Sequence, residues 1–294
     1  KRGQSAERGT YTVRFSPDDL QREQQVRQDG FDLMLRRQGW YLIQHRPVYT
    51  DARVIHLSRN GQEESGQDPL TAFYEAFGET TFRKLLRHII FHQQGTLNEL
   101  RGMCSGEQKL TKYLDFMQRY RLIVLEGENW RKGPEYRAIN NIGSSLEWYI
   151  AEWFRRWLQV PARHGVTIKG VADGGDLDVV AFVDGIRVMI ECKSGSPTQI
   201  SETDVRLFFQ RAADFNPEIA VLLIDTESRI DQQIEIFNRL RTGGDPLKPQ
   251  DPGKTLYWGA RHIYVTNTRP GIGEALSAIL RLYYSKIRHI SFWR

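Results

Sequence analysis

Residues 176–195 read DLDVVAFVDGIRVMIECKSG, and this stretch decides the fold. Two apolar runs of strand-like composition flank the dipeptide Asp184-Gly185, which is typical of the tight turn in a β-hairpin. The sequence therefore predicts two antiparallel strands with charged residues at their open end.

The expected geometry of this hairpin brings acidic residues together. Side chains alternate across a strand, so Glu191 and Lys193 share one face while Cys192 points to the other. A two-residue turn at 184 and 185 pairs positions whose numbers sum to about 369, which places Asp178 opposite Glu191. Two carboxylates on an apolar sheet are unfavourable unless a cation compensates. The pattern predicts a Mg²⁺ or Mn²⁺ site at Asp178 and Glu191, with the main-chain carbonyl of Cys192 as a further oxygen ligand.

Two other interpretations of the same residues stay open. Asp176 is a rival metal ligand, because it shares the strand face of Asp178 one pleat earlier. Alternatively, the charged residues form a surface ladder across the hairpin, which cross-strand pairing tolerates.

A helix expected over residues 144–159, SSLEWYIAEWFRRWLQ, precedes the hairpin. Its apolar residues fall on one face at helical spacing, and Glu147 borders that face. The tryptophans and tyrosines of this helix could stack on bases, but their spacing favours core packing.

Roughly residues 141–290 resemble the PD-(D/E)XK nuclease superfamily. The resemblance rests on an acidic helix followed by the pattern D…ExK, which here are LEWYIAEW and then GDLDVVAFVDGIRVMIECKSG. Within it the segment is most similar to the nuclease half of the CRISPR ancillary nucleases. The resemblance implies that Asp178 and Glu191 hold the metal and that Lys193 orients or deprotonates the attacking water. Glu147 would complete the catalytic site.

The resemblance also implies a restriction-endonuclease-like α/β fold with a mixed sheet, an endonuclease that hydrolyses DNA phosphodiesters, and a role in prokaryotic antiviral defence. The 66 residues before the first linker are too few for the nucleotide-sensing domain of those relatives. Activation by a cyclic oligonucleotide is therefore not implied. Many members of that family act as dimers, so the resemblance also implies a homodimer or membership of a defence complex.

The pattern after the hairpin fits the mixed sheet. A helix capped by Ser201 is followed by the buried strand EIAVLLIDT, a helix over 229–241, the strand HIYVTNT and a helix over 272–288. Arg206 and Gln210 lie one turn apart on the first of these helices. They are candidate phosphate contacts, with a solvated helix face as the alternative.

The middle of the chain, residues 70–140, resembles a winged helix-turn-helix. Three helices are followed by a basic-tipped β-hairpin, and residues 83–140 hold eleven basic against six acidic side chains, a local net charge of +5. Such a domain places a helix in the major groove and its wing on the backbone. The candidate nucleic-acid contacts are Lys109, Lys112 and Arg119 in the helix and Arg131 and Lys132 in the hairpin. Docking or dimerisation is the alternative use of the same fold.

The chain thus divides into a small N-terminal α/β region (1–66), a winged helix-turn-helix (70–140) and a nuclease domain (141–294), with a polar linker at 59–69. Hydrophobic residues at 40% and charged residues at 26% are typical of a folded protein. Two cysteines, no apolar run of membrane-spanning length and no signal peptide predict a cytoplasmic protein without a membrane partner.

The sequence therefore predicts a metal-dependent phosphodiesterase whose partner is nucleic acid, with DNA favoured over RNA. Two alternatives remain. The first is a non-catalytic nucleic-acid-binding or adaptor protein with a degenerate nuclease fold. The second is an RNA-directed nuclease.

Overall fold

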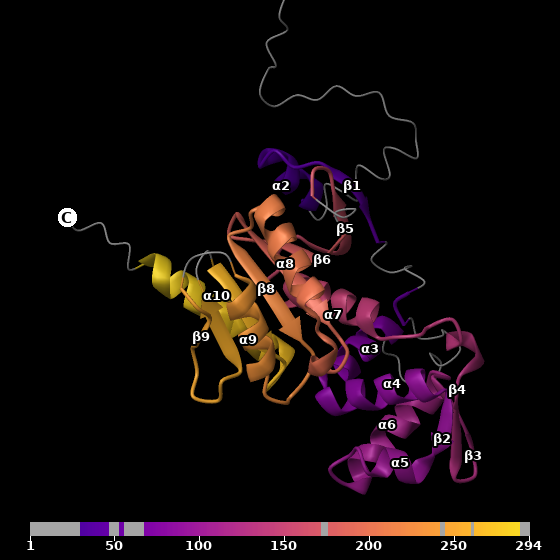
Figure 1. The fold of residues 1–294 in the computed structure, drawn as a ribbon. Coiled ribbons are helices and arrows are strands. Elements are labelled where there is room, and N and C mark those ends of the chain that lie inside the picture. Colours follow the sequence, from indigo (N-terminus) through magenta and orange to yellow (C-terminus); the bar gives the residue numbers. More distant parts are fainter. Residues whose placement is uncertain are drawn as a thin grey trace, which may run out of the picture.

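The computed structural model of the chain describes residues 30–46, 53–55, 68–171, 176–241, 245–259 and 262–288. Figure 1 shows two halves packed against each other: a large sheet with helices on both faces, and a mainly helical half that carries a small sheet. We call them the large-sheet half and the helical half. None of the described helices is long and apolar enough to cross a membrane.

The large sheet is mixed and has eight strands in the order β1-β5-β6-β7-β8-β11-β10-β9. Their bounds are β1 Leu42–His45, β5 Ala162–Ile168, β6 Asp176–Val183, β7 Ile186–Lys193, β8 Ile219–Ile224, β9 Lys248–Pro249, β10 Leu256–Gly259 and β11 Ile263–Asn267. Strands β1, β5, β6 and β7 pair antiparallel, whereas β7, β8 and β11 run parallel. This arrangement confirms the mixed sheet expected from an antiparallel hairpin followed by alternating strands and helices.

The hairpin of β6 and β7 has the predicted register. Val179 pairs with Ile190 and Val183 with Ile186, so paired numbers sum to 369. Asp184 and Gly185 form the turn with φ values of 50° and 83°, the left-handed conformation that a tight hairpin turn requires. The start of β6 therefore lies beside the end of β7.

Helices cover both faces of this sheet (Figure 1). Their bounds are α2 Phe31–Arg37, α7 Gly143–Trp157, α8 Glu202–Phe215, α9 Asp231–Leu240 and α10 Ile272–Arg288. Buried side chains of α7 and α10 share one core cluster, and those of α2, α8 and α9 share the other. Residues of β8 alternate between the two clusters, which confirms a strand buried on both faces.

The N-terminal region is not a separate unit where the structure describes it. Strand β1 pairs antiparallel with β5, with Leu42 opposite Ile168 and His45 opposite Val166. Phe31 and Leu35 of α2 pack in the same core as β6. The boundary expected after residue 66 therefore separates segments that share one sheet, because edge pairing links residues that are distant in sequence. The part of the expected N-terminal α/β region that precedes residue 30 lies outside the described residues.

The helical half has the element order α-α-β-α-α-β-β. Its bounds are α3 Pro69–Gly78, α4 Thr80–His92, β2 Gln94–Thr96, α5 Leu97–Arg101, α6 Glu107–Arg119, β3 Ile123–Glu126 and β4 Asn129–Lys132. The three strands form a sheet in the order β2-β4-β3. Thr96 and Glu99 form a capping box at the start of α5.

The two halves share a continuous apolar core rather than a flexible junction. Phe73 of α3 stacks on Trp148 of α7 with ring centroids 5.7 Å apart, and Tyr74 stacks on Tyr149 at 4.8 Å. The aromatic residues of α7 are thus mostly core, as predicted, although Trp157 at its end is 70% exposed. The type of secondary-structure arrangement therefore changes at residue 141, but the apolar core continues across this position.

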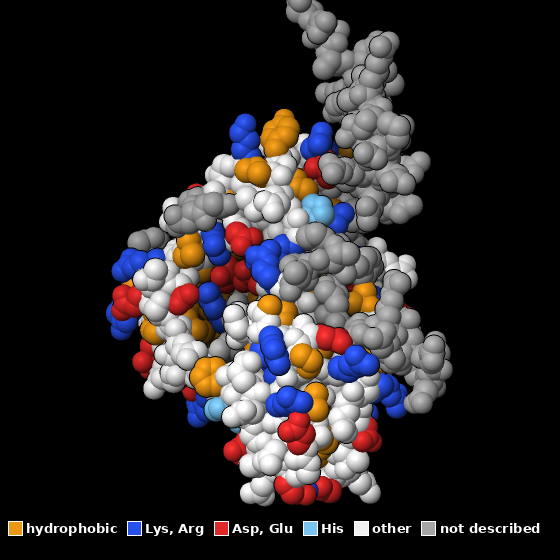
Figure 2. Space-filling model, turned by 90° about the vertical axis from the view of Figure 1, so that its right-hand side faces the viewer, with side chains coloured by type: hydrophobic (Ala, Val, Ile, Leu, Met, Phe, Trp, Pro, Cys, Tyr) orange, Lys and Arg blue, Asp and Glu red, His pale blue; other side chains and the backbone are white. Residues whose placement is uncertain are grey.

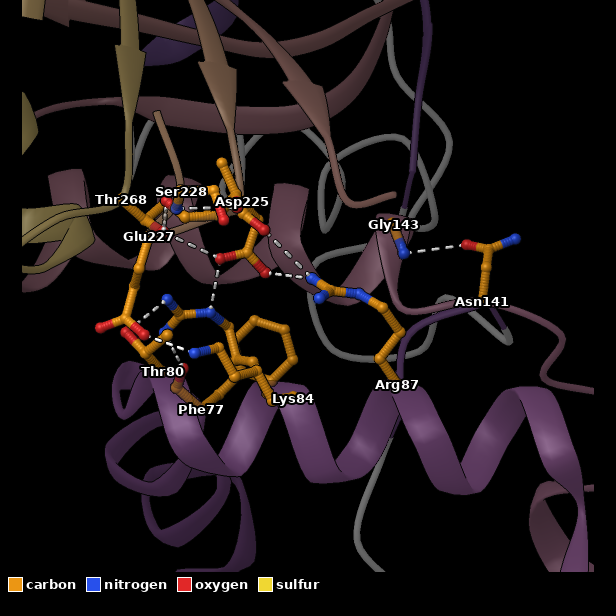
Figure 3. A network of polar contacts seen from close by, with 12 residues as sticks. Phe77, Thr80, Lys84, Arg87, Asn141, Gly143, Asp225, Glu227, Ser228 and Thr268 are labelled. Carbon is orange, nitrogen blue, oxygen red and sulfur yellow. Dashed lines mark hydrogen bonds and ion pairs between the residues drawn. The ribbon is translucent and has the colours of Figure 1, made fainter. Parts of the chain in front are cut away.

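A buried ion pair also joins the halves. Arg83 of α4 is 0% exposed, and its Nε lies 3.0 Å from Oδ1 of Asp225, just after β8. Arg87 Nη2 donates to the other carboxylate oxygen at 2.6 Å, and the Thr268 hydroxyl donates to Oδ1 at 3.1 Å. Figure 3 shows Arg87 reaching from α4 to the carboxylate of Asp225.

We expect Asp225→Ala to lower the free energy of unfolding by about 3–5 kcal/mol, because it leaves the charge of Arg83 buried without its partner. Urea denaturation measures this change. The neighbouring pair of Lys84 and Glu227 is 42% and 44% exposed and serves as the matched control. Lys84→Ala should change stability by about 1 kcal/mol or less. Equal effects of the two substitutions would contradict the prediction.

Candidate active site

The open end of the β6–β7 hairpin brings the predicted acids together. The backbone amide of Cys192 donates a hydrogen bond of 2.7 Å to Oδ2 of Asp178. This bond holds the carboxylate of Asp178 against the end of β7, next to Glu191 and Lys193. The Cys192 side chain packs against the apolar core on the α7 side, as its strand position predicts.

Four carboxylates surround this point, and we call Glu147, Asp176, Asp178 and Glu191 the carboxylate cluster. Figure 2 shows acidic side chains gathered in a hollow near the middle of one face, with basic side chains around it. Glu191 is 5% exposed and Glu147 is 8% exposed. Glu147 and Glu191 are therefore buried, whereas the side chain of Asp176 is 48% exposed.

Burial and mutual repulsion raise the pKa values of two acids of the cluster. Burial raises the pKa of Asp178 well above its usual range, and the charges of Glu191 and Glu147 raise it further. Burial also raises the pKa of Glu147 to about 7, with Asp176 and Glu191 adding to the effect and Arg46 opposing it. These acids need a positive partner to be ionised at neutral pH.

Arg46, which follows β1, is one such partner. It forms an ion pair with Glu147 through Nη1, and its Nη2 lies 3.3 Å from Oδ2 of Asp176. Gly165 leaves the room for it, because a Cβ built there would lie 2.3 Å from Cδ of the Arg46 side chain. No sequence pattern indicates this contact, because Arg46 lies in a segment assigned to a different unit.

Lys193 contacts two carboxylates. Its Nζ lies 3.2 Å from Oε1 of Glu191 and 2.9 Å from Oδ1 of Asp204. Burial alone would lower the pKa of Lys193, but the two acids outweigh it and raise the pKa above its ordinary value. Lys193 is therefore a protonated hydrogen-bond donor in this arrangement.

Helix α8 supplies two site residues that were not predicted. Arg211 Nη1 lies 2.9 Å from Oε2 of Glu191. Asp204, which contacts Lys193, also forms the capping box with Ser201 at the start of the helix. Asp204 and Arg211 are seven residues apart, or about two helical turns, so they share a face. That spacing is the signal that could have identified them.

The residues predicted on this helix lie elsewhere. Arg206 and Gln210 are exposed on α8, and Arg206 lies 3.9 Å from Glu202 in an exposed ion pair. This placement matches the solvated helix face that was the alternative for both residues.

Two of the three predicted nucleic-acid contacts of α6 line a groove against α3 with a cavity volume of 850 Å³. Lys112 and Arg119 line it together with four acids, which are Glu75, Glu79, Glu107 and Asp115. Lys109 lies 3.6 Å from Glu79. The acids offset the positive charge that a phosphate backbone would require here.

The hairpin of β3 and β4 differs from the prediction at one residue. Arg131 is exposed and lies 2.8 Å from Glu126. Lys132, however, is 6% exposed, and its Nζ donates to the carbonyl oxygens of Arg137 and Ile139 at 3.2 and 2.9 Å. Alternation along β4 turns Lys132 inward with Trp130, so it is not a surface contact for phosphate.

The carboxylate cluster has the oxygen ligands that Mg²⁺ and Mn²⁺ prefer. In the described residues, however, no three His, Cys, Asp or Glu side chains are arranged to hold a metal ion. Arg46, Lys193 and Arg211 contact these carboxylates instead. Carboxylate oxygens are suitable ligands for a hard divalent cation. A cation bound to them would displace at least one of the ion pairs with Arg46, Lys193 or Arg211.

No protein-family model matches this sequence, and no curated protein matches it. Among solved structures, the chain is similar to protein VC1899 from Vibrio cholerae, at 12% identity and a TM-score of 0.42, covering 86% of this chain and 60% of that one. It is also similar to Can2 from Sulfobacillus thermosulfidooxidans in complex with cyclic tetra-adenylate, at 13% identity and a TM-score of 0.44, covering 72% and 55%. The chain thus spans less than two thirds of either protein's length.

The raised pKa of Glu147 makes stability depend on pH. Between the ordinary pKa of 4.5 and the raised value of about 7, the folded protein keeps a proton on Glu147 that the unfolded chain releases. The free energy of unfolding should therefore fall as pH rises through this window. Glu147→Gln removes this contribution, so wild type should lose more stability than the variant between pH 4.5 and 7.

Urea denaturation of both proteins across that pH range, in the presence of a chelator, tests this expectation. A difference between wild type and Glu147→Gln that stays constant with pH would contradict it.

Proposed function

We propose that this protein is a metal-dependent nuclease whose active site is the carboxylate cluster with Lys193. The observation that carries the proposal is the hydrogen bond from the Cys192 amide to Asp178, which holds Asp178 beside Glu191 at the open end of the hairpin. Buried carboxylates that raise one another's pKa need a cation to be ionised together. A site with strongly perturbed groups in a hollow is a candidate for catalysis.

Asp178 and Glu191 would hold the metal, and Glu147 would complete the site. Mg²⁺ or Mn²⁺ bound there would lower the pKa of a bound water and neutralise charge on the phosphoryl group. The main-chain carbonyl of Cys192 remains the predicted further ligand, and Asp176 remains the rival side chain.

The cationic side chains have separate tasks in this proposal. Lys193 is a donor, so it would orient the attacking water or the phosphate rather than remove a proton. Arg211 would hold the Glu191 carboxylate in place through its 2.9 Å contact. Arg46 balances Glu147 on the opposite side of the cluster.

The finer fold assignments belong to the same proposal. The β6–β7 hairpin, the parallel strands after it and the acidic helix α7 fit the PD-(D/E)XK arrangement that the sequence resembles. The order α4-β2-α5-α6-β3-β4 fits a winged helix-turn-helix. Its α6 faces an acidic groove, which favours the docking alternative for this unit over major-groove binding. A role in antiviral defence rests on the sequence resemblance alone.

Cleavage assays with labelled nucleic acid test the activity. We expect Mg²⁺ or Mn²⁺ to be required, EDTA to abolish cleavage, and Glu191→Ala to reduce the rate by roughly 10²-fold or more. Arg206→Ala, in an exposed ion pair on α8, is a control for surface charge. Equal products from wild type, Glu191→Ala and EDTA-treated samples would refute the enzyme and favour the non-catalytic adaptor.

DNA and RNA of the same sequence, digested side by side, decide the substrate class. We expect DNA to be cut faster, as the sequence resemblance implies. Faster cleavage of RNA would support the RNA-directed alternative.

Metal binding can be measured without turnover. Mg²⁺ or Mn²⁺ should raise the melting temperature of the wild-type protein, by an amount equivalent to about 2.7 kcal/mol at a hundred times the dissociation constant. Asp178→Asn should remove this shift, because it removes a negatively charged ligand. Asp115→Asn, on the exposed face of α6, should keep it. A shift that survives in Asp178→Asn would exclude this residue as a ligand.

A further inference from the structure

A second hollow lies beside the carboxylate cluster, between α4 and the turn that follows β7. We call it the α4 cleft, and its lining includes Lys84, Arg87, Phe91, Asn141, Ser194 and Gln199. Its cavity volume is 440 Å³. Pockets for small molecules are typically about 300–1,000 Å³, so one nucleotide would fit.

The α4 cleft is continuous in the chain with the proposed active site. Ser194 directly follows Lys193, and both Ser194 and Gly195 line the cleft. A Cβ built on Gly143 would lie 3.5 Å from the Ser194 hydroxyl, so the first turn of α7 borders the same space. The α4 cleft therefore begins at the residue that follows Lys193 in the chain.

The charges along the α4 cleft suit a phosphate. Lys84 and Arg87 are 42% and 32% exposed at its wall. Arg87 is held by Asp225 through Nη2, and its Nε has no hydrogen-bond partner among the described residues. The N-terminus of α7, a helix of 15 residues, adds a favourable dipole. Figure 3 shows Arg87 rising from α4 and turning its guanidinium toward Asp225, with Gly143 and Asn141 on the other side of the side chain.

Aromatic rings line the same cleft. Phe91 is 76% exposed, the highest value among the large apolar side chains that the structure leaves on the surface of the described residues. Its ring lies 5.0 Å from that of His92, which in turn lies 4.2 Å from His88. An exposed phenylalanine beside phosphate-binding cations is the arrangement that proteins use to stack an unpaired base.

We propose that the α4 cleft binds an unpaired nucleotide of a single-stranded nucleic acid, with its base on Phe91 and its phosphate near Arg87 and Lys84. This inference rests on the proposed function, because it places the cleft on the path of the strand that leaves the scissile phosphate. If the α4 cleft binds an unpaired nucleotide, the substrate is a single strand or a duplex with an unpaired end.

Fluorescence anisotropy of a labelled single strand of about 12 nucleotides tests the proposal on the full chain with EDTA present. We expect the single strand to bind more tightly than the same sequence annealed to its complement. Phe91→Ala should weaken single-strand binding by roughly 5- to 100-fold, as expected from the loss of one stacked base. Phe91→Trp, which keeps an aromatic face, should retain wild-type affinity.

Tyr41→Ala is the matched control, because Tyr41 is 61% exposed and lies before β1 rather than on α4. It should leave the affinity unchanged. A Phe91→Ala effect within twofold, or an equal loss in Tyr41→Ala, would overturn the proposal. Tighter binding of the duplex would also overturn it. A free mononucleotide that competes as well as the strand would show that the cleft takes a separate ligand, not the substrate strand.

The two proposals fail in different ways. Binding that depends on Phe91, without metal-dependent cleavage, would refute the nuclease and keep the α4 cleft as a nucleic-acid site. Cleavage that depends on Glu191, with binding and rate unaffected by Phe91→Ala, would refute the cleft and keep the nuclease.

Discussion

The structure depends on how buried negative charge is balanced at the open end of the β6–β7 hairpin. Glu147, Asp178 and Glu191 come from different elements and raise one another's energy when ionised. Cations reach them from three directions: Arg46 after β1, Lys193 at the end of β7 and Arg211 on α8. These ion pairs therefore connect the edge strand, the central hairpin and the covering helix.

Local patterns predicted much of this fold. The Asp184-Gly185 turn and the apolar alternation around it fixed the register of the hairpin, and hence the position of Asp178 beside Glu191. The capping residue Ser201 marked a helix start that the structure confirms. These features depend on residues that are close in sequence, where steric and hydrogen-bonding rules leave few choices.

Contacts between distant segments could not be predicted in the same way. Arg46 contacts Glu147 across a separation of 101 residues, and nothing near Arg46 in the sequence indicates that partner. The pairing of β1 with β5 and the stacking of Phe73 on Trp148 likewise cross the expected domain boundaries. Lys132 shows a related limit, because net charge identifies basic residues but not which of them a strand turns inward.

The contact between Asp225 and the end of β7 has a mechanical consequence. The amide of Asp225 donates to the carbonyl oxygen of Lys193 at 2.8 Å, while its carboxylate is held by Arg83 and Arg87 of α4. A hinge motion between the halves would have to pull a buried guanidinium from its counter-ion. The helical half is therefore held rigidly against the end of β7. A molecule bound to the helical half would keep a constant distance and angle from Lys193.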